Sequence, residues 1–178
     1  HRRGQISEQA VKEAQGKVLM LAMSGWSGLS ATDIRAAFGA AAAGVAKEID
    51  LADQLAPILA SAEQISGNPR LIKRFLNNLL IRESIAKSQN LTIGFPELVK
   101  LQLFERCASA AGFEHLAKAV AASDDGKVKF LADLETSAGK GEAWTAPPQW
   151  PQVFYEQWVK LAPPLGDVDL RPLMHLSR

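Results

Sequence analysis

The helical spacing of apolar residues is the feature that most limits how this 178-residue chain can fold. Apolar side chains recur at intervals of three and four residues along most of its length. This spacing places them in one stripe on an α-helix, whereas a half-buried strand needs strict alternation of apolar and polar residues. Since no stretch of six or more residues alternates in that way, the sequence predicts an all-α bundle of about seven to nine helices.

Capping signals and turn residues set the expected ends of these helices. Ser30-x-x-Asp33 resembles a capping box, and Asp50-x-x-Asp53 is a second candidate helix start. The segment 138–152 is rich in Gly, Pro and Trp, so we expect a loop there, followed by a helix and an extended C-terminal tail. We expect one domain, with a bundle over 1–137 and the remainder, 138–178, packed on it. The expected helices cover about residues 5–22, 30–46, 50–66, 68–88, 95–104, 113–122, 128–134 and 152–161.

Composition excludes several functional classes. Hydrophobic residues make up 47% and charged residues 22%, which is typical of a folded globular protein, and the net charge is only +1. The single cysteine, Cys107, excludes an internal disulfide and is expected to be a buried thiol. His115 and His175 lack the spacing of metal ligands, and no serine lies in a nucleophile motif, so we predict neither a metal site nor catalytic residues.

No apolar run reaches the roughly 18 residues that a membrane span needs, and no signal peptide is visible. The chain begins with His1 and not with methionine, from which we expect a processed chain or a fragment.

The most informative stretch is 67–77, which reads Gly-Asn-Pro-Arg-Leu-Ile-Lys-Arg-Phe-Leu-Asn. Asn68 is a favoured N-cap residue and Pro69 suits the first helical position, so a helix should begin here, directly after a turn at Gly67. A buried stripe is predicted on this helix at Leu71, Ile72, Phe75, Leu76, Leu79 and Leu80.

The same helix begins with an unusual concentration of positive charge. Arg70, Lys73 and Arg74 lie in its first turns, where each cation opposes the helix dipole at a cost of roughly 0.3–1 kcal/mol. We therefore expect these side chains to have an anionic partner, although an ordinary solvated face would also account for Lys73 and Arg74. The amides of Asn77 and Asn78 are expected to bond a neighbouring helix end.

The stretch 67–77 resembles the sensor-2 motif of AAA+-like ATPases and, more closely, the signature of the KAP family of P-loop NTPases. The tail 169–178, which reads Asp-Leu-Arg-Pro-Leu-Met-His-Leu-Ser-Arg, is similar to a second KAP motif. Each resemblance covers about ten residues. The phosphate-binding loop G-x-x-x-x-G-K-[ST] is absent, so the resemblance concerns only the region that follows the nucleotide-binding core.

This resemblance implies a C-terminal helical lid or regulatory region of an ATPase. In such enzymes the residue that Arg70 matches reaches the γ-phosphate, with Lys73 and Arg74 as further candidate contacts. ATP and Mg²⁺ are implied for the full-length parent, and the chain should not hydrolyse ATP without its N-terminal nucleotide-binding core. The alternative for Arg70 is a structural contact at the preceding turn. The resemblance also implies a cytoplasmic protein whose parent is in some cases membrane-associated.

The sequence is also compatible with other functions. The aromatic segment Trp144–Trp158 forms either a small hydrophobic core or a surface for a protein partner or a second copy of the chain. Arg171 in the tail either holds the tail on the bundle or contacts a neighbouring subunit. A stand-alone helical interaction module is thus the alternative function, and nucleic-acid binding through the basic helix ranks last because the net charge is low.

Overall fold

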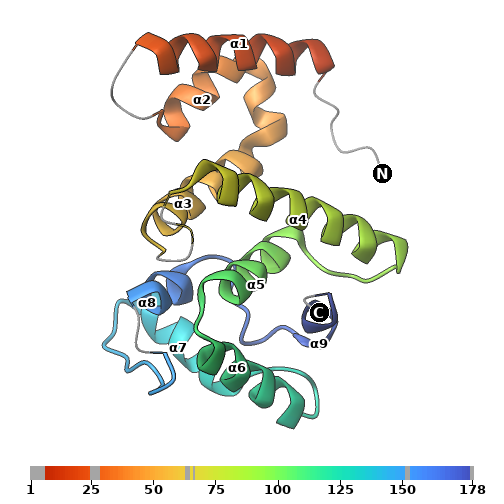
Figure 1. Cartoon of the computed structure of the whole chain (residues 1–178), viewed down its shortest axis with the longest axis vertical. Coiled ribbons are helices and arrows are strands. Elements are labelled where there is room, and N and C mark those ends of the chain that lie inside the picture. The colour runs from red at the N-terminus through yellow and green to blue at the C-terminus, as the bar shows by residue number, and fades with distance from the viewer. Residues whose placement is uncertain (1–6, 25–28, 63–64, 66, 151–152, 177–178) are drawn as a thin grey trace. The chain divides into compact units, whose positions relative to one another are not determined.

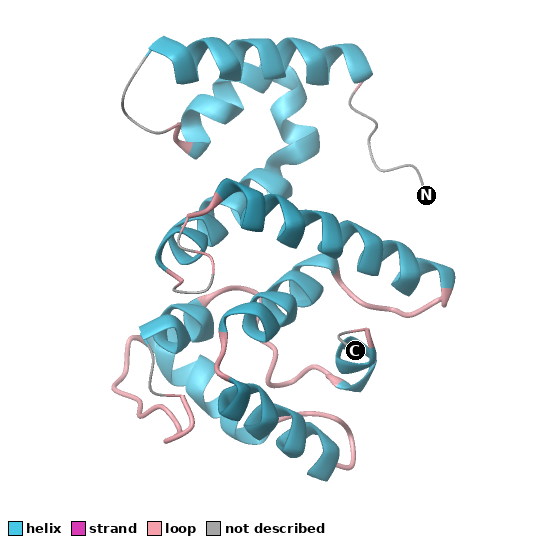
Figure 2. Ribbon diagram, in the orientation of Figure 1, coloured by secondary structure: helices cyan, strands magenta, loops and turns pink. Residues whose placement is uncertain are grey.

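The computed structural model describes residues 7–24, 29–62, 65, 67–150 and 153–176. Within them Figure 2 shows helices joined by loops and no strand, which confirms the predicted all-α class. Contacts along the chain group it into two compact units, 1–57 and 58–178. The Gly-, Pro- and Trp-rich segment lies inside the second unit.

The first unit is built on α1, which packs against α2 (Figure 1). The capping box at Ser30 is confirmed, because its hydroxyl accepts from the backbone N–H of Asp33 and the Asp33 carboxylate accepts from that of Ser30. The predicted continuous helix over 30–46 is wrong: Gly39 takes φ 56°, ends α2 and opens a 3-10 helix. The elements are α1 (Glu8–Ser24), α2 (Ala31–Phe38), η1 (Gly39–Val45) and α3 (Ala46–Ser61), whose last turn belongs to the second unit.

The predicted helix start at Asp50 is also wrong. The helix α3 already begins at Ala46, so Asp50 lies inside it, and its carboxylate accepts from the guanidinium of Arg35 on α2. The sequence around Asp50 resembles a helix start, because aspartate is a favoured N-cap residue. In the structure its carboxylate instead pairs with a residue of the neighbouring helix.

The second unit is organised around α5 (Phe95–Cys107), a helix that was predicted over 95–104. Every residue from Leu98 to Phe104 on this helix is buried, and α4 and α8 pack against it (Figure 1). The ring of Phe104 lies 4.4 Å from that of Trp158 and 5.2 Å from that of Trp150, measured between centroids. The helices are α4 (Pro69–Ser88), α5 (Phe95–Cys107), α6 (Ala110–Ala122), α7 (Lys129–Lys140), α8 (Val153–Lys160) and α9 (Arg171–His175).

The helix α4 buries a narrower stripe than predicted. Phe75 and Leu79 are buried, but Leu76 and Leu80 remain 44% and 57% exposed, so the prediction is wrong for these two residues. They lie one position further round the helix than the buried pair, and this rotation turns them away from α5. An aliphatic strip that includes Ile81 and Ile85 is therefore left on the outer side of α4.

The C-terminal segment is less extended than predicted at its end, where Arg171–His175 forms the short helix α9. The segment before it is anchored by backbone bonds from Val128 to Gly166 and from Leu170 to Gly126. Gly126 has φ 75°, a conformation that favours glycine, and it lies against the Asp169 side chain.

Candidate functional site

The start of α4 is built as the sequence predicted. The side chain of Asn68 accepts a hydrogen bond of 3.0 Å from the backbone N–H of Arg70, and Pro69 follows the cap directly. Gly67 has φ 64°, which allows its N–H to bond the carbonyl of Leu59 at 3.0 Å. The turn and cap together fix where the first basic residue of the helix emerges.

Arg70 is exposed, as are Lys73 and Arg74 one turn further along. Within the described part of the chain none of these three side chains has a hydrogen bond or an ion pair to an acidic group. The remaining basic residues of the helix are neutralised: Arg82 donates to Glu105 at 2.7 Å, and Lys87 pairs with Glu83 at 2.8 Å. The unpaired positive charge of α4 is thus concentrated toward its N-terminal half.

A groove of about 300 Å³ lies between α4 and α5. From α4 it receives Arg74 and Arg82, which are two turns apart, and from α5 it receives Arg106. Arg82 is half-buried and held by both Gln102 and Glu105, whereas Arg106 is exposed. The groove is completed by the side chains of Leu71, Phe75 and Asn78.

The α5 members of this groove were not predicted from the sequence. Gln102, Glu105 and Arg106 are three of the polar residues of α5, and Glu105 and Arg106 follow Gln102 by three and four positions. Such spacing puts them on one side of a helix, so this regularity was the available signal. Which helix that side would face could not be inferred without the fold.

Asn77 is exposed on α4, and the predicted bond from its amide to a neighbouring helix end is not seen among the described contacts. Asn78, the next residue, is the one that lines the groove.

The second motif, in the tail, contacts the turn between α6 and α7. Asp169 accepts from Nε and Nη2 of Arg171 at 2.9 and 2.7 Å, and Nη1 of Arg171 donates to the carbonyl of Asp124 at 3.1 Å. These bonds to Arg171 lower the pKa of the Asp169 carboxyl. Of the two predicted roles for Arg171, its contacts support the one in which it holds the tail on the bundle.

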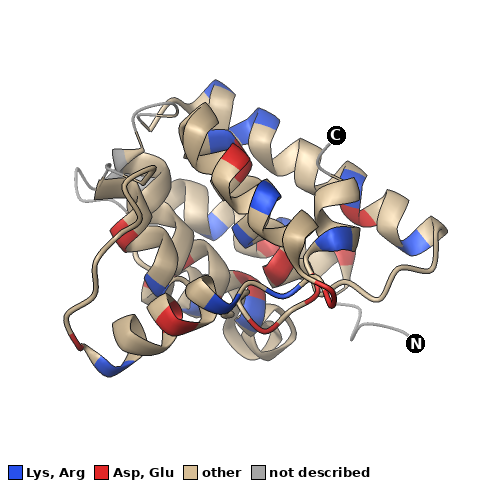
Figure 3. Cartoon of the chain, turned by 90° about the horizontal axis from the view of Figure 1, so that it is seen from below, with Lys and Arg blue, Asp and Glu red and all other residues tan. Residues whose placement is uncertain are grey.

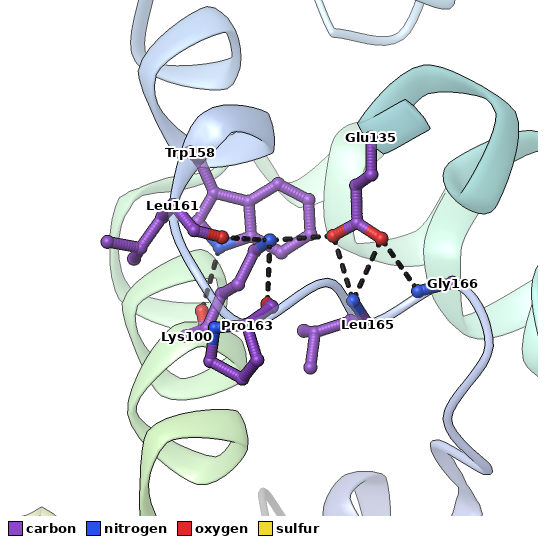
Figure 4. Close-up of polar contacts among 7 residues, drawn as sticks. All are labelled: Lys100, Glu135, Trp158, Leu161, Pro163, Leu165 and Gly166. Atoms are coloured by element: carbon purple, nitrogen blue, oxygen red, sulfur yellow. Dashed lines mark hydrogen bonds and ion pairs between the residues drawn. The ribbon is translucent and has the colours of Figure 1, made fainter. Parts of the chain in front are cut away.

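A buried ion pair links the centre of this unit to the segment before the tail (Figure 4). The Lys100 ammonium donates to Glu135 and to the carbonyls of Leu161 and Pro163. Burial lowers the pKa of Lys100, while the charge of Glu135 opposes that shift. The carboxylate also accepts from the backbone N–H groups of Leu165 and Gly166. Since every partner is internal, this network holds the fold and leaves no group for a ligand.

The aromatic segment contributes to the core. Trp150, Tyr155 and Trp158 are buried, and the indole N–H of Trp158 donates to the carbonyl of Lys100 at 2.7 Å. Trp144 is half-buried. This burial favours the interpretation of the segment as a hydrophobic core over that of a surface for a partner.

Nucleophilic and metal-binding chemistry has no support in the described residues. Burial raises the pKa of the Cys107 thiol to about 12, so its reactive thiolate form is suppressed. No group of three or more His, Cys, Asp or Glu side chains there could hold a metal ion. Among the same residues no helix is both long and apolar enough to cross a bilayer.

No protein-family model, curated protein or solved structure matches this chain. The likeness to KAP proteins therefore rests on the two short motifs, at the start of α4 and in the tail.

Proposed function

We propose that this chain is the helical lid and regulatory region of a KAP-like P-loop ATPase, in which Arg70 contacts the triphosphate of a nucleotide bound by a separate core. ATP and Mg²⁺ would bind that core, and the chain alone would not hydrolyse ATP. A guanidinium group is planar and can donate hydrogen bonds to two phosphoryl oxygens. When it is carried by a hinged helical region, closure of that region over the nucleotide depends on whether the γ-phosphate is present. A cytoplasmic location belongs to the same proposal.

The observation that carries this proposal is that Arg70 is exposed and has no acidic partner among the described residues. Its side chain is exposed at the start of α4, and its guanidinium has no acidic partner in the described residues. The backbone that carries it is fixed by the Asn68 cap. A positioned but unpaired arginine is what a contact to an external phosphate requires, and a guanidinium sealed against a carboxylate would have been unable to serve.

The exposed aliphatic strip of α4 supports docking of the core on the same helix. Leu80 and Ile81 are 57% and 58% exposed, and Leu76 and Ile85 extend the strip by a turn on either side. Aliphatic side chains that follow one another along a helix favour burial against another protein surface. In this proposal the nucleotide-binding core covers them and brings its nucleotide to Arg70.

The test is the ATPase rate of the full-length parent with Arg70→Gln. We expect a loss of about a thousandfold, the lower end of what removal of a transition-state arginine costs. Lys87→Gln is the matched control: it removes a charge from the far end of the same helix and should leave the rate unchanged. An Arg70→Gln parent with the full rate, or a parent reading frame without a phosphate-binding loop, would refute the proposal.

The aliphatic strip also favours the second candidate, a stand-alone helical interaction module. This candidate predicts that Leu80→Glu abolishes capture of a protein partner that binds without ATP, in a parent that lacks nucleotide-binding motifs. A partner that binds only when ATP is present would exclude it.

Nucleic-acid binding has the weakest support. Basic and acidic residues are intermixed over the visible helices (Figure 3), and two of the five basic residues counted on α4 are paired with glutamates. A phosphate-binding face would give a steep fall of affinity with salt in an anisotropy titration, with a log–log slope of roughly −0.9 per phosphate. We expect no such salt-dependent binding.

A further inference from the structure

We propose that the groove between α4 and α5 is a binding site for a small phosphoryl anion, with Arg74 and Arg106 as its direct ligands. This site is separate from the proposed contact of Arg70 with a nucleotide, because Arg70 does not line the groove. The proposal rests on how charge is distributed among the residues that meet there.

The groove carries a net positive charge that is only partly neutralised. Three guanidinium groups, from Arg74, Arg82 and Arg106, face one carboxylate, that of Glu105. Since Glu105 is paired with Arg82 at 2.7 Å, a charge of about +2 remains on the other two arginines. A phosphomonoester or pyrophosphate carries about two negative charges or more near neutral pH, so the charges are complementary.

The two free guanidinium groups come from different helices, and this arrangement suits a tetrahedral anion. Arg74 is on α4 and Arg106 is on α5, and neither has an ion pair with a described residue. Each planar fork can donate two parallel bonds to phosphoryl oxygens, which a single lysine cannot do. The amide of Asn78, one turn after Arg74, adds two further donors at the groove.

The surrounding groups increase the strength of such contacts. Phe75 is buried and Leu71 is half-buried beside the arginines, so they add a small apolar patch to a lining that is mainly polar. Next to this patch the interaction of a bound anion with nearby charges is stronger than in open water. The pair of Arg82 with Glu105 and Gln102 also joins α4 to α5 and keeps the two ligand-bearing helices in register.

The volume of about 300 Å³ limits the ligand. It lies at the lower end of the range for small-molecule sites, which favours a phosphate or pyrophosphate group over an extended acidic peptide. The same phosphoryl chemistry is supplied by the free anion or by the phosphate chain of a nucleotide, and the experiment must separate these sources.

The experiment is isothermal titration of the whole 178-residue chain with inorganic pyrophosphate and, separately, with ATP without metal. Saturable binding of pyrophosphate at one site is expected, and its absence overturns the proposal. Equal affinity for the two ligands assigns the site to the phosphate chain itself. Affinity for ATP more than tenfold higher supports the same site with a nucleotide as the natural source.

Variants connect the binding to the groove. Arg106→Gln should weaken pyrophosphate binding about ten- to hundredfold, the range for loss of a charged hydrogen-bonding partner. Lys118→Gln makes the same charge change on α6, at a residue paired with Glu114 on the surface, and should have no effect. An equal loss in both variants would show a nonspecific charge effect and refute the site.

Glu105→Gln gives a result of the opposite sign. It removes the one negative charge at the groove, so pyrophosphate should bind several-fold more tightly although the bond to Arg82 is weakened. Weaker binding by a Glu105→Gln variant that thermal unfolding shows to be as stable as the unsubstituted chain would overturn the proposal.

Arg70→Gln separates this site from the proposed ATPase role. Pyrophosphate binding by this variant should match that of the unsubstituted chain, whatever the ATPase rate of the parent. Loss of binding in Arg70→Gln but not in Arg106→Gln would place the anion at the helix start and refute the groove.

Discussion

The ammonium of Lys100 on α5 donates to Oε1 of Glu135 on α7 over 2.6 Å, and both side chains are buried. The same carboxylate accepts from the N–H groups of Leu165 and Gly166, so one ion pair joins two helices to the segment that leads into the tail. Burial of an ion is costly unless its partner stays in place, and this pair therefore makes the unit sensitive to loss of either member.

Glu135→Ala should lower the free energy of unfolding by about 3–5 kcal/mol, because it leaves the Lys100 ammonium buried without a counter-charge. Urea unfolding followed by tryptophan fluorescence measures this loss. Glu114→Ala, which breaks the exposed pair with Lys118, is the control and should shift the midpoint little. Equal midpoints for Glu135→Ala and the unsubstituted chain would contradict the structural role of the pair.

Asn68→Ala should destabilise the chain by about 1 kcal/mol, because the N–H of Arg70 loses the acceptor that caps α4. The loss is read from urea denaturation. Asn77→Ala makes the same chemical change at an exposed position inside α4, where alanine has the better helix propensity, so it should be neutral or slightly stabilising. If the two variants had the same stability, the cap would contribute nothing.

Gly166→Ala should destabilise the second unit by about 1–3 kcal/mol, as expected of overpacking. A Cβ at this position would overlap the backbone nitrogen and Cα of Ala132, and the chain would have to move to make room for it. Gly139→Ala on α7 is the matched control, since nothing lies within 4 Å of its added Cβ and the helix should gain up to about 1 kcal/mol. Thermal unfolding should move in opposite directions for the two variants, and a shared direction would count against this packing.

Asp169→Asn should weaken the dependence of stability on acid pH. The pKa of Asp169 is lowered by its bonds to Arg171, so the folded chain binds fewer protons than the unfolded chain below about pH 4. The stability that this carboxylate contributes is present above its unfolded pKa and is lost as the pH falls through its folded pKa. Urea midpoints measured between about pH 5 and pH 3 should therefore fall less steeply for the variant. An unchanged slope would show that this contact is not coupled to folding.

Features that depend only on residues close together in the sequence, such as helix caps, were predicted well. The cap at Asn68, the capping box at Ser30 and the helix expected over 95–104 were all predicted correctly, because a cap and an apolar helix are decided within a few residues. Predictions that required knowledge of the neighbouring helix were less accurate. Leu76 was expected to be buried, and Arg106 was not identified at all.

The sequence by itself determined that the chain is helical, where α4 begins, and that positive charge gathers in its first turns. Only the tertiary structure decided that Arg82 meets Glu105, 23 positions away, and that Lys100 meets Glu135, 35 positions away. Helix formation depends on side chains within one or two turns of each other. The pairing of charges on different helices depends on how those helices rotate to bury their apolar stripes, and this rotation is settled only when the whole core packs.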